Sequence, residues 1–264
     1  SRPTHHRQHS GAALPGAAAP FSSARWGNRR LLARLIHRPR HWRRTTLVLL
    51  PLLAALLLIG SLEAAWDFGR ITKLAEKRYG PLGSARFRLN DWQELLRVEA
   101  DAPVGDKLQA VNLFFNRNLR FRDDIALWKT KDYWATPVEA LHKGAGDCED
   151  YAIAKYFTLR KLGVPSDKLR ITYVKAVRLK QAHMVLTYYP TPNAIPLVLD
   201  NLIDGIVSAD KRNDLVPVYA FNAEGMWLPG AGGNKRVGDS KRLSRWVDLT
   251  KKMQAEGFPA ESAQ

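Results

Sequence analysis

The sequence contains a single cysteine in 264 residues, and this scarcity excludes several classes of protein. One thiol cannot form a disulfide within the chain, and it cannot supply the thiolates of a structural zinc site. A hydrophobic fraction of 45% excludes a wholly disordered chain. The length fits one domain, or one domain with an appendage.

Acidic residues are missing from the first 46 positions, where ten arginines contribute much of the net charge of +16. The same stretch holds five of the seven histidines and little apolar periodicity, which is typical of disordered chain. In the rest of the chain 31 basic residues face 25 acidic ones. A nucleic-acid-binding domain is therefore not favoured, because the charge is concentrated outside the predicted folded part.

An uncharged, mostly apolar segment follows at residues 45–62. It is intermediate between a spanning helix of about 20 residues and a signal-peptide core of about 7–15 residues. The positive-inside rule predicts that residues 1–44 are a disordered basic leader in the cytoplasm and that residues 66–264 are exported to the periplasm. We expect an uncleaved signal-anchor in the inner membrane, with a cleaved signal peptide as the alternative.

Residues 66–264 are predicted to form one α+β domain, helical in its first half and β-rich in its second. Asn90 is a candidate N-cap, and Thr136 to Glu139 form a capping box. Helices are expected at residues 66–79, 90–118, 136–143 and 148–162, and a short one at the end of the chain. Strands are expected at residues 170–178, 183–189, 195–200 and 215–221, and around Trp227. A Gly-rich basic loop is expected at residues 230–245.

Cys148 is a candidate nucleophile because it begins a predicted helix directly after Gly144-Ala-Gly-Asp147. The free backbone N–H groups and the dipole at a helix N-terminus stabilise a thiolate and can receive an oxyanion. The acidic neighbours of Cys148 indicate an exposed position rather than a core. A structural cysteine is the competing interpretation.

A base for this thiol must come from His142 or His183, the two histidines of the predicted domain. His142 lies beside Lys143 and is typical of a surface residue. His183 begins a β-type run in which alternation places it on one face with Val185 and Thr187. We therefore expect His183 to be the base, although a lone histidine is often only a core residue.

A third group should orient the imidazole. Asp200 ends an apolar run seventeen residues after His183, which suits a neighbouring strand. Asn201 and Asp204 are alternatives that the spacing alone leaves open.

Three motifs in this region resemble the bacterial transglutaminase-like cysteine proteinases, in particular those of the LapG type. They are Asp132-Tyr-Trp-Ala-Thr-Pro-Val-Glu-Ala-Leu141, Gly146-Asp-Cys-Glu-Asp-Tyr-Ala-Ile-Ala-Lys155, and His183 with Leu199-Asp200-Asn201. The resemblance spans roughly residues 66–250. It implies a papain/transglutaminase-like fold, with the nucleophile at a helix N-terminus packed on an antiparallel sheet, and a Cys148-His183-Asp200 triad.

The same resemblance implies calcium-dependent endoproteolysis in the periplasm. Such enzymes cleave the N-terminal region of a large repeat adhesin, which releases the adhesin and disperses a biofilm. An inner-membrane receptor for cyclic di-GMP, of the LapD type, sequesters the protease when the nucleotide is abundant.

The calcium ligands implied by the resemblance are Asp147 and Glu149, with Asp150 as a further candidate. Carboxylate oxygens suit Ca²⁺, but three acids at a helix N-terminus can also simply complement the dipole. Trp134 is expected either in the substrate cleft or in the core.

Two other functions remain open from the sequence. One is a transglutaminase or amidase, that is, a different acyl transferase on the same fold. The other is a non-catalytic binding module tethered to the membrane, against which the complete Cys, His and Asp set argues.

Overall fold

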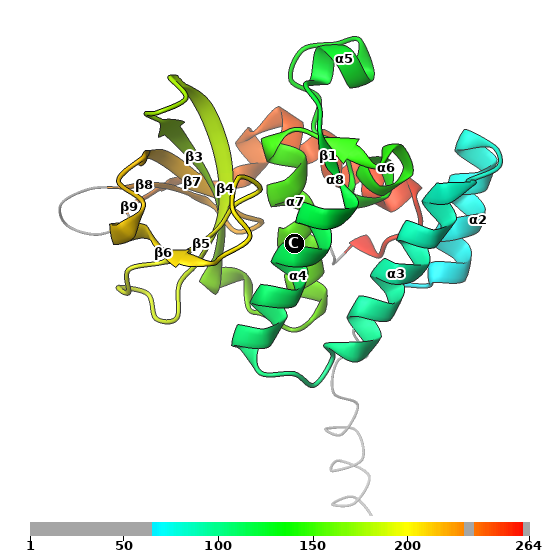
Figure 1. The fold of residues 1–264 in the computed structure, drawn as a ribbon, viewed down its shortest axis with the longest axis horizontal. Helices are drawn as coiled ribbons and strands as arrows, with labels where there is room; N and C mark the ends of the chain where they lie inside the picture. The colour runs from blue at the N-terminus through cyan, green and yellow to red at the C-terminus, as the bar shows by residue number, and fades with distance from the viewer. Residues whose placement is uncertain (1–64, 230–234, 261–264) are drawn as a thin grey trace, which may run out of the picture. The chain divides into compact units, whose positions relative to one another are not determined.

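The computed structural model describes residues 65–229 and 235–260, which form a set of helices and an antiparallel sheet (Figure 1). The predicted leader at residues 1–44 and the apolar segment at residues 45–62 lie outside these ranges. Within them, no helix is both long enough and apolar enough to cross a membrane.

The helices follow one another through the first half of the described chain, and one more closes it. They are α2 (Phe68–Tyr79), α3 (Ser84–Val98), α4 (Val104–Asn118), α5 (Asp124–Trp128), α6 (Pro137–Lys143), α7 (Cys148–Lys161) and α8 (Ser244–Ala255).

Two sheets are present among the described residues. β1 (Arg120–Phe121) and β2 (Ala145–Gly146) make a short parallel pair. The larger, seven-stranded sheet is antiparallel throughout, in the order β6-β5-β4-β3-β7-β8-β9. Its strands are β3 (Leu169–Ala176), β4 (Gln181–Tyr188), β5 (Leu197–Leu199), β6 (Val207–Ser208), β7 (Leu215–Phe221), β8 (Met226–Leu228) and β9 (Lys235–Gly238). The predicted α+β class is confirmed.

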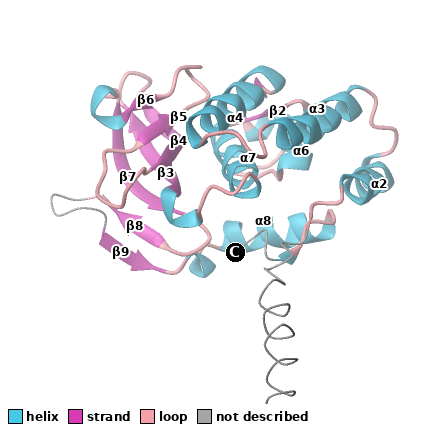
Figure 2. Ribbon diagram, turned by 90° about the horizontal axis from the view of Figure 1, so that it is seen from below, coloured by secondary structure: helices cyan, strands magenta, loops and turns pink. Residues whose placement is uncertain are grey.

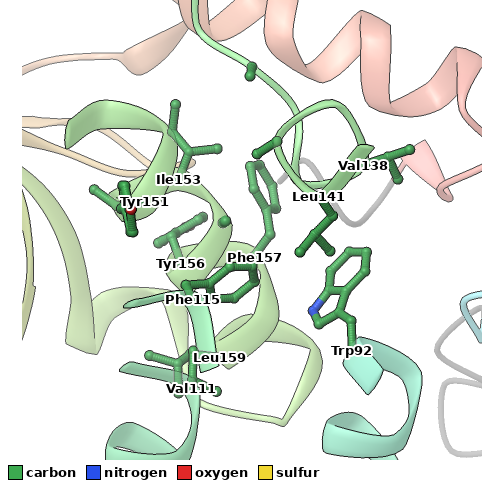
Figure 3. Close-up of a cluster of buried hydrophobic side chains, with 14 of the residues drawn as sticks. Trp92, Val111, Phe115, Val138, Leu141, Tyr151, Ile153, Tyr156, Phe157 and Leu159 are labelled. Carbon is green, nitrogen blue, oxygen red and sulfur yellow. The ribbon is translucent and has the colours of Figure 1, made fainter. Parts of the chain in front are cut away.

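Helix α7 is the centre of the domain. It is buried without a break from Asp150 to Leu159, so it has no solvent-facing stripe over that stretch. It packs against strands β3 and β4 and against helices α4 and α6. Figure 3 shows the aromatic and aliphatic side chains of this core, in which the Trp92 indole N–H donates to Thr158 Oγ1 at 2.9 Å.

The last helix returns to the same core. Trp246 of α8 stacks on Phe157 of α7, with ring centroids 5.5 Å apart and planes 11° from parallel. In Figure 2 the helices gather on one side of the large sheet. The helix that carries the candidate nucleophile is thereby held between the sheet and the remaining helices.

Two local predictions were wrong. The periodic stretch 90–118 is two helices, and Asn90 lies inside α3 rather than at its cap. Pro103 is the N-cap of α4, and a proline disfavours helical backbone in the residue before it. The predicted loop at residues 230–245 contains β9, which pairs with β8; such pairing leaves no local signal in a Gly-rich basic sequence.

Glycine has a specific packing role just before α7. A Cβ atom on Gly146 would lie 2.7 Å from Cβ of Asp150, closer than real contacts allow. The absence of a side chain lets Asp150 fold back beneath β2, where its carboxylate accepts hydrogen bonds from the backbone N–H groups of Ala135 (2.7 Å) and Asp147 (3.3 Å). The backbone leading into Cys148 is fixed by these bonds.

Candidate active site

Cys148 is the first residue of α7, directly after the N-cap Asp147. Its thiol is free and half-buried, and it donates a hydrogen bond to Glu149 Oε2 at 3.1 Å. Burial, and next the charge of Glu149, raise the pKa of this thiol, while a hydrogen bond from the backbone of Met184 opposes the rise. The predicted stabilisation of a thiolate by the helix terminus is thus opposed by burial and by the acids around the thiol.

The side chains of His183 and Asp200 are hydrogen-bonded. The imidazole Nε2 lies 2.8 Å from Asp200 Oδ1, and both side chains are buried. His183 comes from β4, and Asp200 follows the end of β5, the strand paired with β4. With Nε2 engaged, Nδ1 is the ring nitrogen left for another partner.

The carboxylate of Asp200 has three donors around it. Besides His183, the Leu202 backbone N–H donates to Oδ1 at 3.0 Å and the Arg212 guanidinium donates to Oδ2 at 2.8 Å. Burial by itself would raise the pKa of Asp200, but the bonds from His183, Leu202 and Arg212 lower it to about 2. Asp200 is therefore ionised at neutral pH and can stabilise a positive imidazolium.

One cavity of about 760 Å³ contains both Cys148 and His183 in its wall. Trp134, Tyr173 and Tyr219 also line it. The rings of Tyr173 and Tyr219 stack with centroids 5.1 Å apart. Asp200 is absent from the lining and lies behind His183, to which it is hydrogen-bonded.

The remaining candidates separate clearly. His142 is not in this cavity; it stacks on Tyr79 with ring centroids 4.2 Å apart. Trp134 is both core and cleft, since it is buried against Phe221 and still contributes to the cavity wall. Asp204 accepts a hydrogen bond from Asn116 rather than from His183.

A cluster of three acids adjoins the thiol. One carboxylate oxygen from each of Asp124, Asp147 and Glu149 lies within 4.8 Å of the others, which is close enough for one metal ion. Asp124 Oδ1 and Asp147 Oδ1 are buried without a hydrogen-bond partner. Unpaired buried carboxylate oxygens are costly alone and fit the oxygen ligands that Ca²⁺ prefers.

Asp124 and Asp147 resist ionisation in this cluster. Burial raises the pKa of Asp124 to about 6, against a hydrogen bond from the backbone N–H of Tyr133. Burial, followed by the charges of Asp150 and Glu149, raises the pKa of Asp147 well above its usual range. The carboxylates of Asp124, Asp147 and Glu149 repel one another when ionised, and a divalent cation between them would offset that repulsion.

Asp150, the further candidate ligand, has a different position. It is fully buried, and its two oxygens accept from Ala135 and Asp147. It lies outside the three-acid cluster, in which Asp124 is the third member.

Sequence reasoning missed Asp124 and Arg212. Asp124 comes to the site because β1, just before it, pairs with β2, just before Cys148. Arg212 lies in an irregular segment after β6. Neither position carries a periodic or motif signal that could have identified it.

The fold and the site together define a cysteine peptidase of the papain/transglutaminase-like class. The family model described as bacterial transglutaminase-like cysteine proteinase matches residues 90–219. Among solved structures, Legionella pneumophila LapG is 46% identical with a TM-score of 0.60, covering 69% of this chain and 97% of LapG. The chain belongs to the bacterial transglutaminase-like cysteine proteinase family.

Two further LapG structures were solved under different calcium conditions. The calcium-bound form is 46% identical with a TM-score of 0.60, and covers 71% of this chain and 99% of LapG. The EGTA-treated form is 46% identical with a TM-score of 0.62, and covers 69% and 97%. No curated protein matches the chain.

Proposed function

We propose that this protein is a calcium-dependent periplasmic endopeptidase that cuts the N-terminal region of a large surface adhesin, using Cys148, His183 and Asp200. The observation that carries the proposal is the His183–Asp200 bond, which leaves Nδ1 as the free ring nitrogen in the wall of the cavity that also contains Cys148. Family membership supplies the reaction class.

Acyl transfer follows from these groups. His183 takes the proton of the Cys148 thiol as sulfur attacks the scissile carbonyl carbon, and the imidazolium is stabilised by Asp200. The C–N bond then breaks as His183 returns that proton to the leaving amine, giving a thioester. Water, deprotonated by His183, hydrolyses the thioester and releases the acid and the free thiol.

The oxyanion of the tetrahedral intermediate needs a donor beside the nucleophile. The backbone N–H of Cys148 lies at the start of α7, where helix N–H groups have no partner within the helix. It is the donor that we assign to this role.

Calcium belongs to the proposal through Asp124, Asp147 and Glu149. A bound ion would supply positive charge that offsets the carboxylates around the thiol and would fix the loop that leads into α7. The support is the pair of unpartnered buried oxygens on Asp124 and Asp147, together with the calcium-bound relative.

The direct test is proteolysis by the chain of residues 1–264. Candidate adhesin N-terminal fragments are incubated with calcium or with EGTA, using wild type and Cys148→Ala. We expect discrete cleavage only by wild type with calcium. Cleavage by Cys148→Ala, or equal cleavage in EGTA, would contradict the catalytic or the calcium part respectively.

A transferase is distinguished in the same assay. An added primary amine should leave the cleavage products unchanged if water is the acceptor. Incorporation of the amine into the fragment at the expense of hydrolysis would favour the transglutaminase-type alternative.

Partners and location complete the proposal. We place residues 1–44 in the cytoplasm, residues 45–62 in the inner membrane and residues 66–264 in the periplasm, where a LapD-type receptor for cyclic di-GMP would sequester the protease and so control biofilm dispersal. Alkaline phosphatase fused after residue 264 should be active, and fused after residue 44 inactive; the reverse pattern would contradict this topology. Co-purification with the receptor should require cyclic di-GMP.

A further inference from the structure

The loop that begins at the buried Asp200 turns outward to solvent in its middle part. Between β5 and β6 the side chains of Leu202, Ile203 and Asp204 are exposed. Apolar packing of Leu199 holds the chain as far as Asp200 and not beyond it, although a triad carboxylate must hold its imidazole within narrow limits. Other contacts must hold this loop in place.

Helix α4 supplies those contacts through two asparagines one turn apart. The Asn116 side-chain amide donates to the Asp200 carbonyl oxygen at 3.0 Å and to Asp204 Oδ1 at 3.1 Å, with the Ile203 carbonyl oxygen at 3.3 Å. Asn112 donates to the Asp204 carbonyl oxygen at 2.9 Å. Residues four apart share one face of a helix, so both amides reach the same loop.

Lys155 determines which way the Asn116 amide points. Its ammonium group, on α7, donates to Asn116 Oδ1 at 2.8 Å. The loop offers the amide only oxygen acceptors, so the N–H donors of Nδ2 face the loop and Oδ1 faces Lys155, where it accepts from the ammonium group. The amide orientation is fixed by this contact.

Keeping Lys155 in this place is costly. The side chain is only 1% exposed, and burial lowers its pKa to about 7, against the attraction of Asp200 and Asp204. The Tyr151 ring lies beside it, with its centroid 5.7 Å from Nζ. None of the salt bridges between described residues includes Lys155, and burying a charge without a carboxylate partner costs free energy. We therefore expect a role of Lys155 other than stabilising the fold.

We infer that Asn116, oriented by Lys155, is a positioning residue for the His183–Asp200 pair. The chain of contacts runs from α7 through Lys155 and Asn116 to the Asp200 backbone, and from the Asp200 carboxylate to His183. Helix α7 therefore positions both reacting groups. It carries Cys148 itself, and it holds His183 indirectly through Lys155, Asn116 and Asp200. The inference rests on the proposed peptidase function for its kinetic consequence alone.

The test compares Asn116→Ala with Asn118→Ala in the chain of residues 1–264. Both asparagines lie on α4, but Asn118 donates to Phe114 of its own helix, at 3.0 Å. We expect Asn116→Ala to lower kcat about 10- to 100-fold with KM within about twofold of wild type. Asn118→Ala should match wild type in both.

A second measurement does not need the peptidase reaction. In the ¹⁵N spectrum of histidine-labelled protein, the His183 signals are assigned by their loss in His183→Gln. Wild type should show one tautomer with hydrogen on Nε2, and Asn116→Ala should show exchange between tautomers. Asn116→Asp repeats the test in a variant that keeps an acceptor for Lys155 while losing the amide donor.

The outcomes separate the two proposals. A wild-type protein with no peptidase activity but a His183 spectrum that changes in Asn116→Ala would refute the function and support the positioning. If kcat and the His183 spectrum of both Asn116 variants equal those of wild type, Asn116 has no positioning role.

Discussion

Helices α6 and α7 begin with the same kind of N-terminal motif, but the acids around the two motifs have different partners. Each opens with a capping box, Thr136 with Glu139 in α6 and Asp147 with Asp150 in α7. Each box lies in a cluster of acids, buried at α6 and partly buried at α7. The difference is what neutralises those acids.

At α6 the chain supplies its own cations. Glu139 pairs with Arg78 at 3.2 Å and with Lys252 at 2.7 Å, and Glu256 lies 3.7 Å from Arg78. At α7 none of the salt bridges between described residues includes Asp124, Asp147 or Glu149. We call the α6 cluster of Glu139 and Glu256 closed, because its cations come from the chain. We call the α7 cluster of Asp124, Asp147 and Glu149 open, because a cation that balances its charge would come from solution.

The largest effect should come from removing the open cluster. We expect Asp147→Asn combined with Glu149→Gln to abolish calcium binding in isothermal titration and to lower calcium-dependent cleavage about 100-fold or more. The matched control is Glu139→Gln in the α6 box, which should keep calcium affinity. Unchanged calcium affinity in the double variant would remove these two residues from the site.

The sequence alone could predict α7 and β4 because their signals are local. A strong apolar helix follows Gly-Asp-Cys, and alternation from His183 matches the register in which Val185 pairs with Thr172 and Thr187 with Arg170. The boundaries failed where tertiary pairing decides, as at β9. Short-range patterns do not encode which edge strand a Gly-rich segment will join.

The residues of the site likewise differ in whether the local sequence identifies them. Cys148 and His183 stand out by scarcity, and the choice of Asp200 over Asp204 depended on family resemblance. Asp124, Arg212 and Asn116 were beyond prediction because each reaches the site across the fold. Their roles come from the β1–β2 pairing, an irregular turn and one helix face, respectively.

Removing a cation from the closed cluster should lower the stability of the fold and leave calcium affinity unchanged. In Lys252→Met the free energy of unfolding should fall by about 2–4 kcal/mol, because the buried Glu139 loses the nearer of its two cations and the Trp134 carbonyl oxygen loses a donor. Urea denaturation measures this. Lys251→Met, an exposed neighbour on the same helix, is the control; equal losses in the two variants would assign the effect to helix α8 in general.

Calcium itself should distinguish the clusters in a stability measurement. At a calcium concentration about 100 times its Kd, the wild type should gain about 2.7 kcal/mol in unfolding free energy. Asp124→Asn should gain less, because one ligand oxygen is missing, while Lys252→Met should gain as much as wild type. A full calcium response in Asp124→Asn would exclude Asp124 as a ligand.

The smallest effect concerns the electrostatic cost of ionising Glu256 in the closed cluster. Burial, and next the charge of Glu139, raise the pKa of Glu256 to about 8. Between its ordinary pKa of about 4.3 and this value, the folded state holds a proton that the unfolded state has released, so stability falls as the pH rises through this window. Glu256→Gln keeps an acceptor for the Thr136 hydroxyl, which lies 2.8 Å from Glu256 Oε1. The variant should therefore flatten this pH dependence.

We expect Glu256→Gln to be more stable than wild type by about 1–2 kcal/mol at pH 8 and nearly equal to it at pH 4.5. Denaturation at both pH values measures the difference, with Asp248→Asn, an exposed carboxylate on α8, as the control. Parallel curves for wild type and Glu256→Gln would mean that Arg78 and Lys252 already neutralise both acids. The contrast between a closed and an open cluster would then be sharper, because all the uncompensated charge would lie beside Cys148.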